Sequence, residues 1–187
     1  LPAASAELRA TYERAIDWRA ATGGLFSPER PDGILDLNGI VKADAIAEAG
    51  RALDDSGCPG WSINVGGDIL VSPPGGGQVI GIADPDDDGN LLCSITLEGS
   101  RRAVATSGSA QRGDHIWLGG STLPAHFRQV SVVADDIVTA DVLATAIVAG
   151  GPEALDDLTA RWDIDVLTVD RTGDLRATPG FRAALAS

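Results

Sequence analysis

Thr139, Asp141 and Thr145 combine one carboxylate with two hydroxyl groups at helical spacing. Asp141 and Thr145 are four residues apart, so on a helix they share one face, about 6 Å apart along the axis. Carboxylate and hydroxyl oxygens are the kind of ligand that a hard divalent cation takes. The same residues also suit a plain helix start, with Thr139 as N-cap and Asp141 in the first turn, where an acid complements the helix dipole. The spacing leaves both interpretations open.

A second candidate site combines the stretch 36–44 with the stretch 64–68. Residues 36–44 open a predicted helix and contain Lys42, the only lysine of the chain; Asn38 could simply cap that helix. In 64–68, two glycines separate Asn-Val from Asp68, which is typical of a hairpin turn. Alternatively, the glycines bring backbone N–H groups close to a ligand, and Asp68 binds a ribose or supports a loop.

A third group of candidates lies around the irregular segment 108–124. His115 is a natural general base there, because small effects move a histidine pKa across neutrality, although an exposed loop histidine is more often inert. His126 has no comparable setting. The hydroxyl-rich turn 105–108 could bind phosphate or could simply end a strand. The sequence has no dinucleotide-binding glycine motif, P-loop, nucleophile elbow or zinc-ligand spacing.

The composition restricts the partners that this protein can bind. A net charge of −13 argues against nucleic acid and against an anionic membrane surface, since both require clustered Lys and Arg. No apolar run approaches the roughly 20 residues of a membrane span. An acidic protein that handles a phosphate-bearing ligand needs a cation to bridge the charges.

The ends of the chain and its cysteines leave the location open. The sequence contains no methionine and no visible signal peptide, so we expect a processed or trimmed, soluble product, either cytoplasmic or exported with its signal removed. Cys58 and Cys93 could pair or stay as free thiols.

Hydrophobic periodicity predicts one α+β domain over residues 1–187, with no internal repeat and no linker. Helices are expected over 6–21, from about 39 or 42 to 53, over 140–148, and from Pro152 after a break at Gly150–Gly151. Strands are expected over 62–65, 68–71, 79–82, 91–97, 102–106, 130–133 and 165–169, with an acidic turn over 84–90 and a short tail from Phe181. Consecutive strands this close together favour antiparallel pairing.

An ordered set of motifs resembles the ApbE family, the flavin transferases that move FMN from FAD onto a threonine of a partner protein. The motifs are Thr-Gly-Gly-Leu-Phe-Ser-Pro at 22–28, Asp-Leu-Asn-Gly-Ile-Val-Lys at 36–42, Asn-Val-Gly-Gly-Asp-Ile at 64–69, Gly-Ile-Ala-Asp-Pro at 81–85, Val-Ala-Thr-Ser-Gly at 104–108, Asp-His-Ile at 114–116 and Thr-Ala-Asp-Val-Leu-Ala-Thr-Ala at 139–146. The resemblance covers about residues 20–150 and implies an ApbE-like α+β fold with largely antiparallel sheets.

The resemblance also implies FAD and Mg²⁺ as ligands and a target protein with an acceptor threonine as partner. It implies that the Val41 carbonyl, Asp141 and Thr145 hold the metal, and that His115 is the base. The flavin and its pyrophosphate would then contact Asn38, Lys42, Asp44, Asn64, Gly66, Gly67, Asp68, Thr106, Ser107, Gly108 and Ile116. In the implied reaction the threonine hydroxyl attacks the FMN phosphorus and AMP leaves.

The sequence departs from the family pattern in three places, of which the first is a small change and the last two favour alternative functions. Ala43 replaces the usual glycine after the lysine, and Leu-Gly-Gly-Ser-Thr at 118–122 replaces an expected Asp-Pro-x-Thr-Gly. The family's N-terminal segment, which supplies part of the flavin site, is not in this chain. The alternatives are a flavin-binding protein that has lost transfer and an FAD pyrophosphatase that yields FMN and AMP.

Overall fold

The computed structural model of the chain describes residues 4–30, 32–72, 77–108 and 125–186. The described helices are α1 (Ala6–Ala21), α2 (Asn38–Asp55), α3 (Ile137–Arg161) and α4 (Pro179–Ala183). The described strands are β1 (Ser62–Val65), β2 (Asp68–Val71), β3 (Gln78–Asp84), β4 (Asp87–Leu97), β5 (Ala103–Gly108), β6 (Phe127–Ala134), β7 (Asp165–Asp170) and β8 (Leu175–Ala177). The fold is α+β, as the sequence predicts.

Six strands form one sheet in the order β1-β2-β5-β6-β7-β8, with every described pair antiparallel. The hairpin of β3 and β4 forms a separate two-stranded sheet. The β1–β2 turn is the predicted glycine hairpin. Val65 pairs with Asp68, while Gly66 and Gly67 have φ angles of 62° and 93°. Glycine populates positive φ without a steric penalty, so this turn needs the two glycines.

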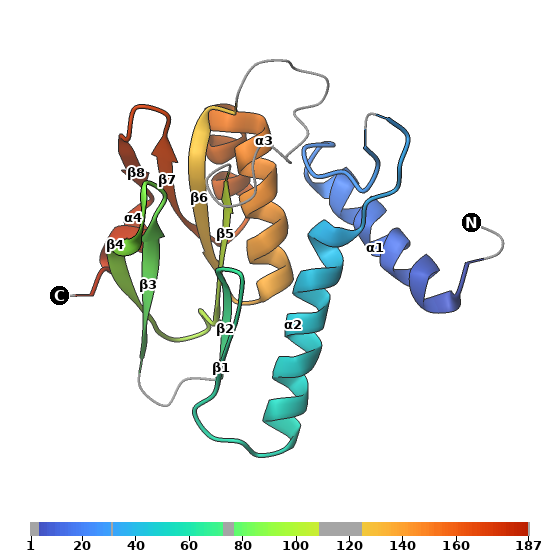
Figure 1. Cartoon of the computed structure of the whole chain (residues 1–187), viewed down its shortest axis with the longest axis horizontal. Coiled ribbons are helices and arrows are strands. Elements are labelled where there is room, and N and C mark those ends of the chain that lie inside the picture. Colours follow the sequence, from blue (N-terminus) through green and yellow to red (C-terminus); the bar gives the residue numbers. More distant parts are fainter. Residues whose placement is uncertain (1–3, 31, 73–76, 109–124, 187) are drawn as a thin grey trace.

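The molecule has three layers, with the six-stranded sheet in the middle (Figure 1). Helix α3 covers one face of the sheet, α2 packs beside it, and α1 lies on the outer side of α2. The β3–β4 hairpin and α4 cover the opposite face. Strand β5 shows the alternation, because Ala103 and Ala105 belong to the helix-side core while Val104 belongs to the hairpin-side core.

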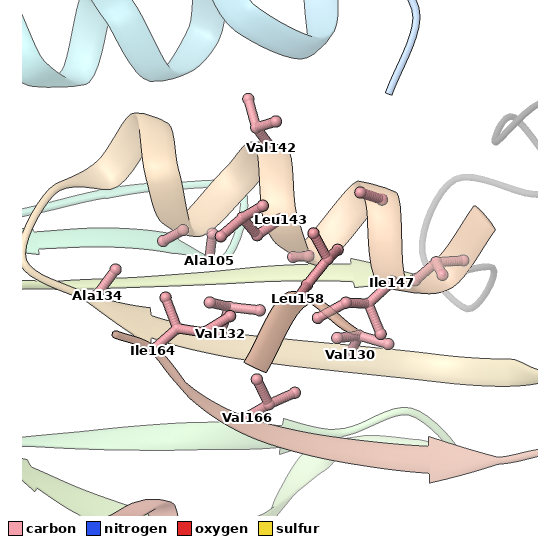
Figure 2. Packing of buried hydrophobic residues seen from close by; sticks show 14 of the residues in the cluster. Ala105, Val130, Val132, Ala134, Val142, Leu143, Ile147, Leu158, Ile164 and Val166 are labelled. Carbon is pink, nitrogen blue, oxygen red and sulfur yellow. The ribbon is translucent and has the colours of Figure 1, made fainter. Parts of the chain in front are cut away.

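The main core lies between α3 and the sheet (Figure 2). Leu143 and Ile147 of α3 pack there with Val130 and Val132 of β6, and all four are fully buried. Among the described helices, α3 alone is long and apolar enough to cross a membrane by length and composition, and most of it is buried inside the fold. It therefore packs as a core helix. In Figure 2, Leu143 and Ile147 are directed at the sheet, whereas Val142 points to the other side of the helix.

Several predicted boundaries differ from the structure. Helix α3 begins earlier than residue 140, because Asp136 is its N-cap: its carboxylate accepts a hydrogen bond from Thr139 N at 2.9 Å. Thr139 is therefore not the cap. The predicted break is present at Gly151, whose φ of 67° and ψ of −152° interrupt the helix immediately before Pro152.

Three further predictions were wrong in detail. Helix α2 begins at Asn38 with Leu37 as N-cap, so Asn38 is not the cap. Strand β4 begins at Asp87, inside the predicted acidic turn 84–90, because the hairpin closes tightly and Asp84 pairs with Asp87. The chain from Phe181 is not a simple tail, because Phe181 lies in α4 and is fully buried against the hairpin-side core.

The two cysteines are free: Cys58 is exposed and Cys93 is half-buried.

Candidate functional site

Lys42 is the centre of a charged cluster contributed by three elements. Its Nζ atom forms a close ion pair with Asp68 Oδ2 and lies 3.6 Å from Asp141 Oδ2. The Lys42, Asp68 and Asp141 side chains are 22%, 0% and 5% exposed. Buried carboxylates require a compensating charge, since desolvation strongly disfavours an isolated anion. The only lysine of the chain therefore serves two buried aspartates, one from β2 and one from α3.

The close approach of α2 to β2 positions Lys42. Lys42, Ile46 and Gly50 are spaced four residues apart and so lie on one stripe of α2. At Gly50 an added Cβ would lie 2.7 Å from Leu70 Cδ2, so glycine lets the helix pack this near to the strand without displacing that side chain. Asp68 and Leu70 are two residues apart and share one face of β2. The same packing thus places the lysine end of the stripe beside Asp68.

Helix α3 brings Asp141 and Thr145 to the end of β5. Both residues follow the first turn, which Asp136 caps, and Asp141 is only 3% exposed. The alternative in which Asp141 is a first-turn acid is therefore wrong. Thr145 lies one turn further along the helix, and its Oγ1 shares a hydrogen bond of 3.1 Å with Ser107 Oγ. A carboxylate and two hydroxyl groups thus lie along one side of α3.

Strand β5 contributes both backbone and side-chain groups to the candidate site. Thr106 N donates a hydrogen bond to Asp68 Oδ1 at 3.3 Å, which fixes the second oxygen of that carboxylate. The Thr106 hydroxyl lies on the other face of the sheet, 2.9 Å from Ser131 Oγ. Gly108 has a packing reason to be glycine, because an added Cβ would lie 2.2 Å from Arg128 O. Residues 105–108 lie within β5 and do not form the predicted turn. Of the groups predicted to bind phosphate there, the Ser107 hydroxyl and backbone groups remain.

Other residues that the resemblance implies lie outside the charged cluster. Asn64 Oδ1 accepts a hydrogen bond from Gly67 N at 3.1 Å, so this side chain stabilises the hairpin turn itself. Asp44 forms an ion pair with Arg14 of α1. Asp44 lies about 200° around α2 from Lys42, which directs it to the opposite side of the helix.

The remaining implied residues are at the surface or outside the described part of the chain. Asn38 and Gly66 are exposed. Val41 is 47% exposed in the first turns of α2. His115 and Ile116 lie outside the described residues, as does the departure at 118–122. Their implied roles stay predictions.

The cluster is suited to an anionic ligand that arrives with a cation. Within the described residues, no group of three or more His, Cys, Asp or Glu side chains could hold a metal. The protein offers Asp141 together with the Thr145 and Ser107 hydroxyls, and Mg²⁺ is commonly held by one or two carboxylates plus substrate phosphates. The sequence alone did not predict the hydrogen bond between Ser107 and Thr145, nor the ion pairs of Lys42 with Asp68 and Asp141. Lys42 itself was identified as a candidate because it is the only lysine of the chain.

Comparison with known proteins places the chain in a family. The model of the ApbE family matches residues 2–168. The chain belongs to the ApbE family. A search among curated protein sequences gives no match. The motifs that suggested ApbE thus occur in a chain that the family model matches over most of its length.

Solved ApbE structures share the fold. The ApbE protein from Thermotoga maritima is 21% identical with a TM-score of 0.81, and the alignment covers 98% of this chain and 79% of that one. The flavin transferase ApbE from Vibrio cholerae is 20% identical with a TM-score of 0.69, covering 98% and 78%. The flavinyl transferase ApbE from Pseudomonas stutzeri is 17% identical with a TM-score of 0.72, covering 97% and 75%. At these identities the likeness establishes the fold.

Proposed function

We propose that this ApbE-family chain is an FAD:protein FMN transferase that depends on Mg²⁺. It transfers FMN from FAD to a threonine hydroxyl of a target protein and releases AMP. The observation that carries the proposal is the meeting of Lys42, Asp68 and Asp141 with the Thr145 and Ser107 hydroxyls, contributed by α2, β2, α3 and β5. The Vibrio cholerae and Pseudomonas stutzeri structures with this fold are named flavin or flavinyl transferases, which supports the reaction class.

The charge of the chain explains why the site needs cations. A protein with net charge −13 repels the pyrophosphate of FAD. Lys42 supplies one positive charge at the cluster, and its ammonium is a point charge suited to a phosphate oxygen. Asp68 holds that lysine beside the sheet and is itself held by Thr106 N. These contacts orient the phosphate-binding group before substrate arrives.

The donors at the cluster fit a hard divalent cation. Asp141 and Thr145, with Ser107 beside them, would hold Mg²⁺ through oxygen ligands, and the carbonyl of Val41 is the further ligand that the family resemblance implies. Bound there, the ion would neutralise charge that develops on the transferring phosphoryl group. Asp141 is buried on a core helix, so the backbone that carries this ligand is already in place before substrate binds.

The bond changes follow from the implied reaction. The threonine oxygen forms a bond to the FMN phosphorus, the bond from that phosphorus to the bridging oxygen breaks, and AMP leaves with the bridging oxygen. The threonine proton requires a base, and His115 is the candidate that the sequence offers. Positioning and charge neutralisation dominate such transfers, which agrees with a cluster of charged groups without a covalent nucleophile.

The proposal is tested by incubating the protein with FAD, Mg²⁺ and a target that carries an acceptor threonine. We expect flavin fluorescence that stays on the target in a denaturing gel, together with AMP. A target with Val in place of the acceptor Thr is the matched control and must stay unlabelled. AMP and free FMN without labelling identify an FAD pyrophosphatase instead. Flavin binding with neither product identifies a protein that has lost transfer.

A further inference from the structure

The Lys42 ammonium lies close to Asp141, the candidate metal ligand. It lies 3.6 Å from Asp141 Oδ2 while it pairs closely with Asp68. The Lys42 ammonium therefore lies within ion-pair distance of two carboxylates that are almost wholly buried. Lys42 is also the mobile member of the group, because its side chain is 22% exposed and has a flexible four-carbon stem. Asp68 and Asp141 are fixed on a strand and on a core helix.

We propose that Lys42 is an internal counter-ion that keeps a divalent cation from Asp141 until a phosphate-bearing ligand draws the ammonium away. The inference rests on the proposed function for the identity of the cation and the ligand. A divalent cation at Asp141 is repelled by an ammonium that contacts the same carboxylate. A pyrophosphate reverses this balance, because its negative charge attracts the ammonium and the metal together.

This arrangement couples the two binding events. Without nucleotide, cation binding must displace Lys42 from Asp141, so the affinity is low. With nucleotide, Lys42 contacts phosphate and no longer repels a cation at Asp141, so the affinity rises. Linkage requires the reverse as well, namely that the cation tightens nucleotide binding by the same factor. Asp68 acts as a positioning residue, because its ion pair keeps the ammonium within reach of Asp141.

The sharpest test removes the internal counter-ion without changing the net charge. The double variant K42Q/D68N loses one positive and one negative charge, so a general change of electrostatic field cancels. Mn²⁺ alone is titrated in the absence of flavin, and free Mn²⁺ is followed by electron paramagnetic resonance. We expect K42Q/D68N to bind Mn²⁺ about tenfold more tightly than wild type, equivalent to about 1.4 kcal/mol. Adding D141N to the double variant should abolish this gain.

A matched control comes from a second ion pair, which joins α2 to the residue just before β5. Arg102 and Asp54 are joined at 3.2 Å and lie outside the charged cluster. The variant R102Q/D54N removes the same charges and should keep Mn²⁺ affinity within about twofold of wild type. If K42Q/D68N does not fold, K42M/D68L repeats the measurement with apolar side chains, which often replace a buried ion pair without loss of stability.

The inference is overturned if the folded double variant binds Mn²⁺ no more tightly than wild type. It is also overturned if the gain survives D141N, or if R102Q/D54N shows the same gain. Because the titration contains no flavin, its result is independent of whether FMN transfer occurs. Failure of the transfer assay with a positive Mn²⁺ result therefore refutes only the proposed function, and the opposite pattern refutes only the counter-ion.

Discussion

Replacement of Asp141 or Asp68 by asparagine should separate catalysis from stability. In Asp141→Asn, Lys42 keeps its closer partner Asp68, and a buried charge is removed. The lost attraction between Lys42 and Asp141 is opposed by the removal of the cost of burying the Asp141 charge. We therefore expect the unfolding free energy to change by at most about 1 kcal/mol. Loss of a ligand from a metal-assisted transfer should instead cost about 3–4 kcal/mol of transition-state stabilisation, or a 10²–10³-fold loss of rate.

Asp68→Asn should show the opposite balance. It breaks the close ion pair with Lys42 at a fully buried position, for which losses of about 3–5 kcal/mol are typical. Partial exposure of Lys42 places the expected loss near the lower end of that range. For a chain of this length each kcal/mol corresponds to about 2–4 °C in melting temperature. We therefore expect D68N to melt roughly 6–12 °C below wild type and D141N within about 4 °C of it.

The assay measures melting temperature and Mg²⁺-dependent AMP release from FAD on the same preparations. AMP release by D68N is compared below its melting transition, so that unfolding does not enter the rate. The reasoning is refuted if D141N melts as low as D68N and still releases AMP within tenfold of wild type. That pattern would make Asp141 a structural counter-charge for Lys42 and no metal ligand.

Substitutions at three further positions have expected outcomes. Thr145→Val should lower the unfolding free energy by about 1 kcal/mol, because the hydrogen bond with Ser107 is lost. It should also weaken the activation by Mg²⁺, whereas Thr145→Ser should retain it. A Mg²⁺ titration of AMP release measures both variants. Phe181→Ala should lower the unfolding free energy by about 3–5 kcal/mol in urea denaturation, because Phe181 is fully buried. The Thr172 hydroxyl and neighbouring backbone N–H groups lower the pKa of Asp170, so its charge stabilises the fold above the unfolded-state pKa, and this contribution is lost as pH falls through the folded-state pKa. The difference between wild type and Asp170→Asn in urea midpoint should therefore shrink between pH 7 and pH 3, and a constant difference would contradict this cause.

Local signals in the sequence predicted much of the fold. Gly66 and Gly67 between two strand-like segments predicted the β1–β2 turn, because positive φ at both positions is a local requirement. The bounds of α1 agree with the prediction over 6–21, which Gly23–Gly24 ends. Gly151 and Pro152 likewise marked the break in α3. Each of these features depends on conformational preferences of a few adjacent residues.

Features that depend on distant residues were harder to predict. Nothing near residues 78–97 indicates that β3 and β4 leave the main sheet and pack on its face. Phe181 was placed in a tail because its burial comes from contact with that hairpin. The residue types did not distinguish Asp136 from Thr139 as the cap of α3, because both Asp and Thr are preferred at an N-cap.

The sequence predicted several residues of the candidate site and did not predict which of them contact one another. Spacing selected Asp141 and Thr145, and uniqueness selected Lys42. The ion pairs of Lys42 require α2, β2 and α3 to meet, and they depend on the close packing at Gly50. The family resemblance implied that Asp44 contacts the flavin together with Lys42, yet Asp44 pairs with Arg14 on the other side of the helix.

The central claim is that nucleotide phosphates and a divalent cation bind where α2, β2, β5 and α3 meet. A crystal structure of the full chain with FAD and Mn²⁺, measured at a wavelength where manganese scatters anomalously, tests it most directly. We predict an anomalous peak at coordination distance, about 2.0–2.2 Å, from oxygens of Asp141 and Thr145 and from a phosphate oxygen of FAD. Ordered FAD elsewhere on the chain, or a manganese peak only at the acidic residues 84–87, would contradict the claim.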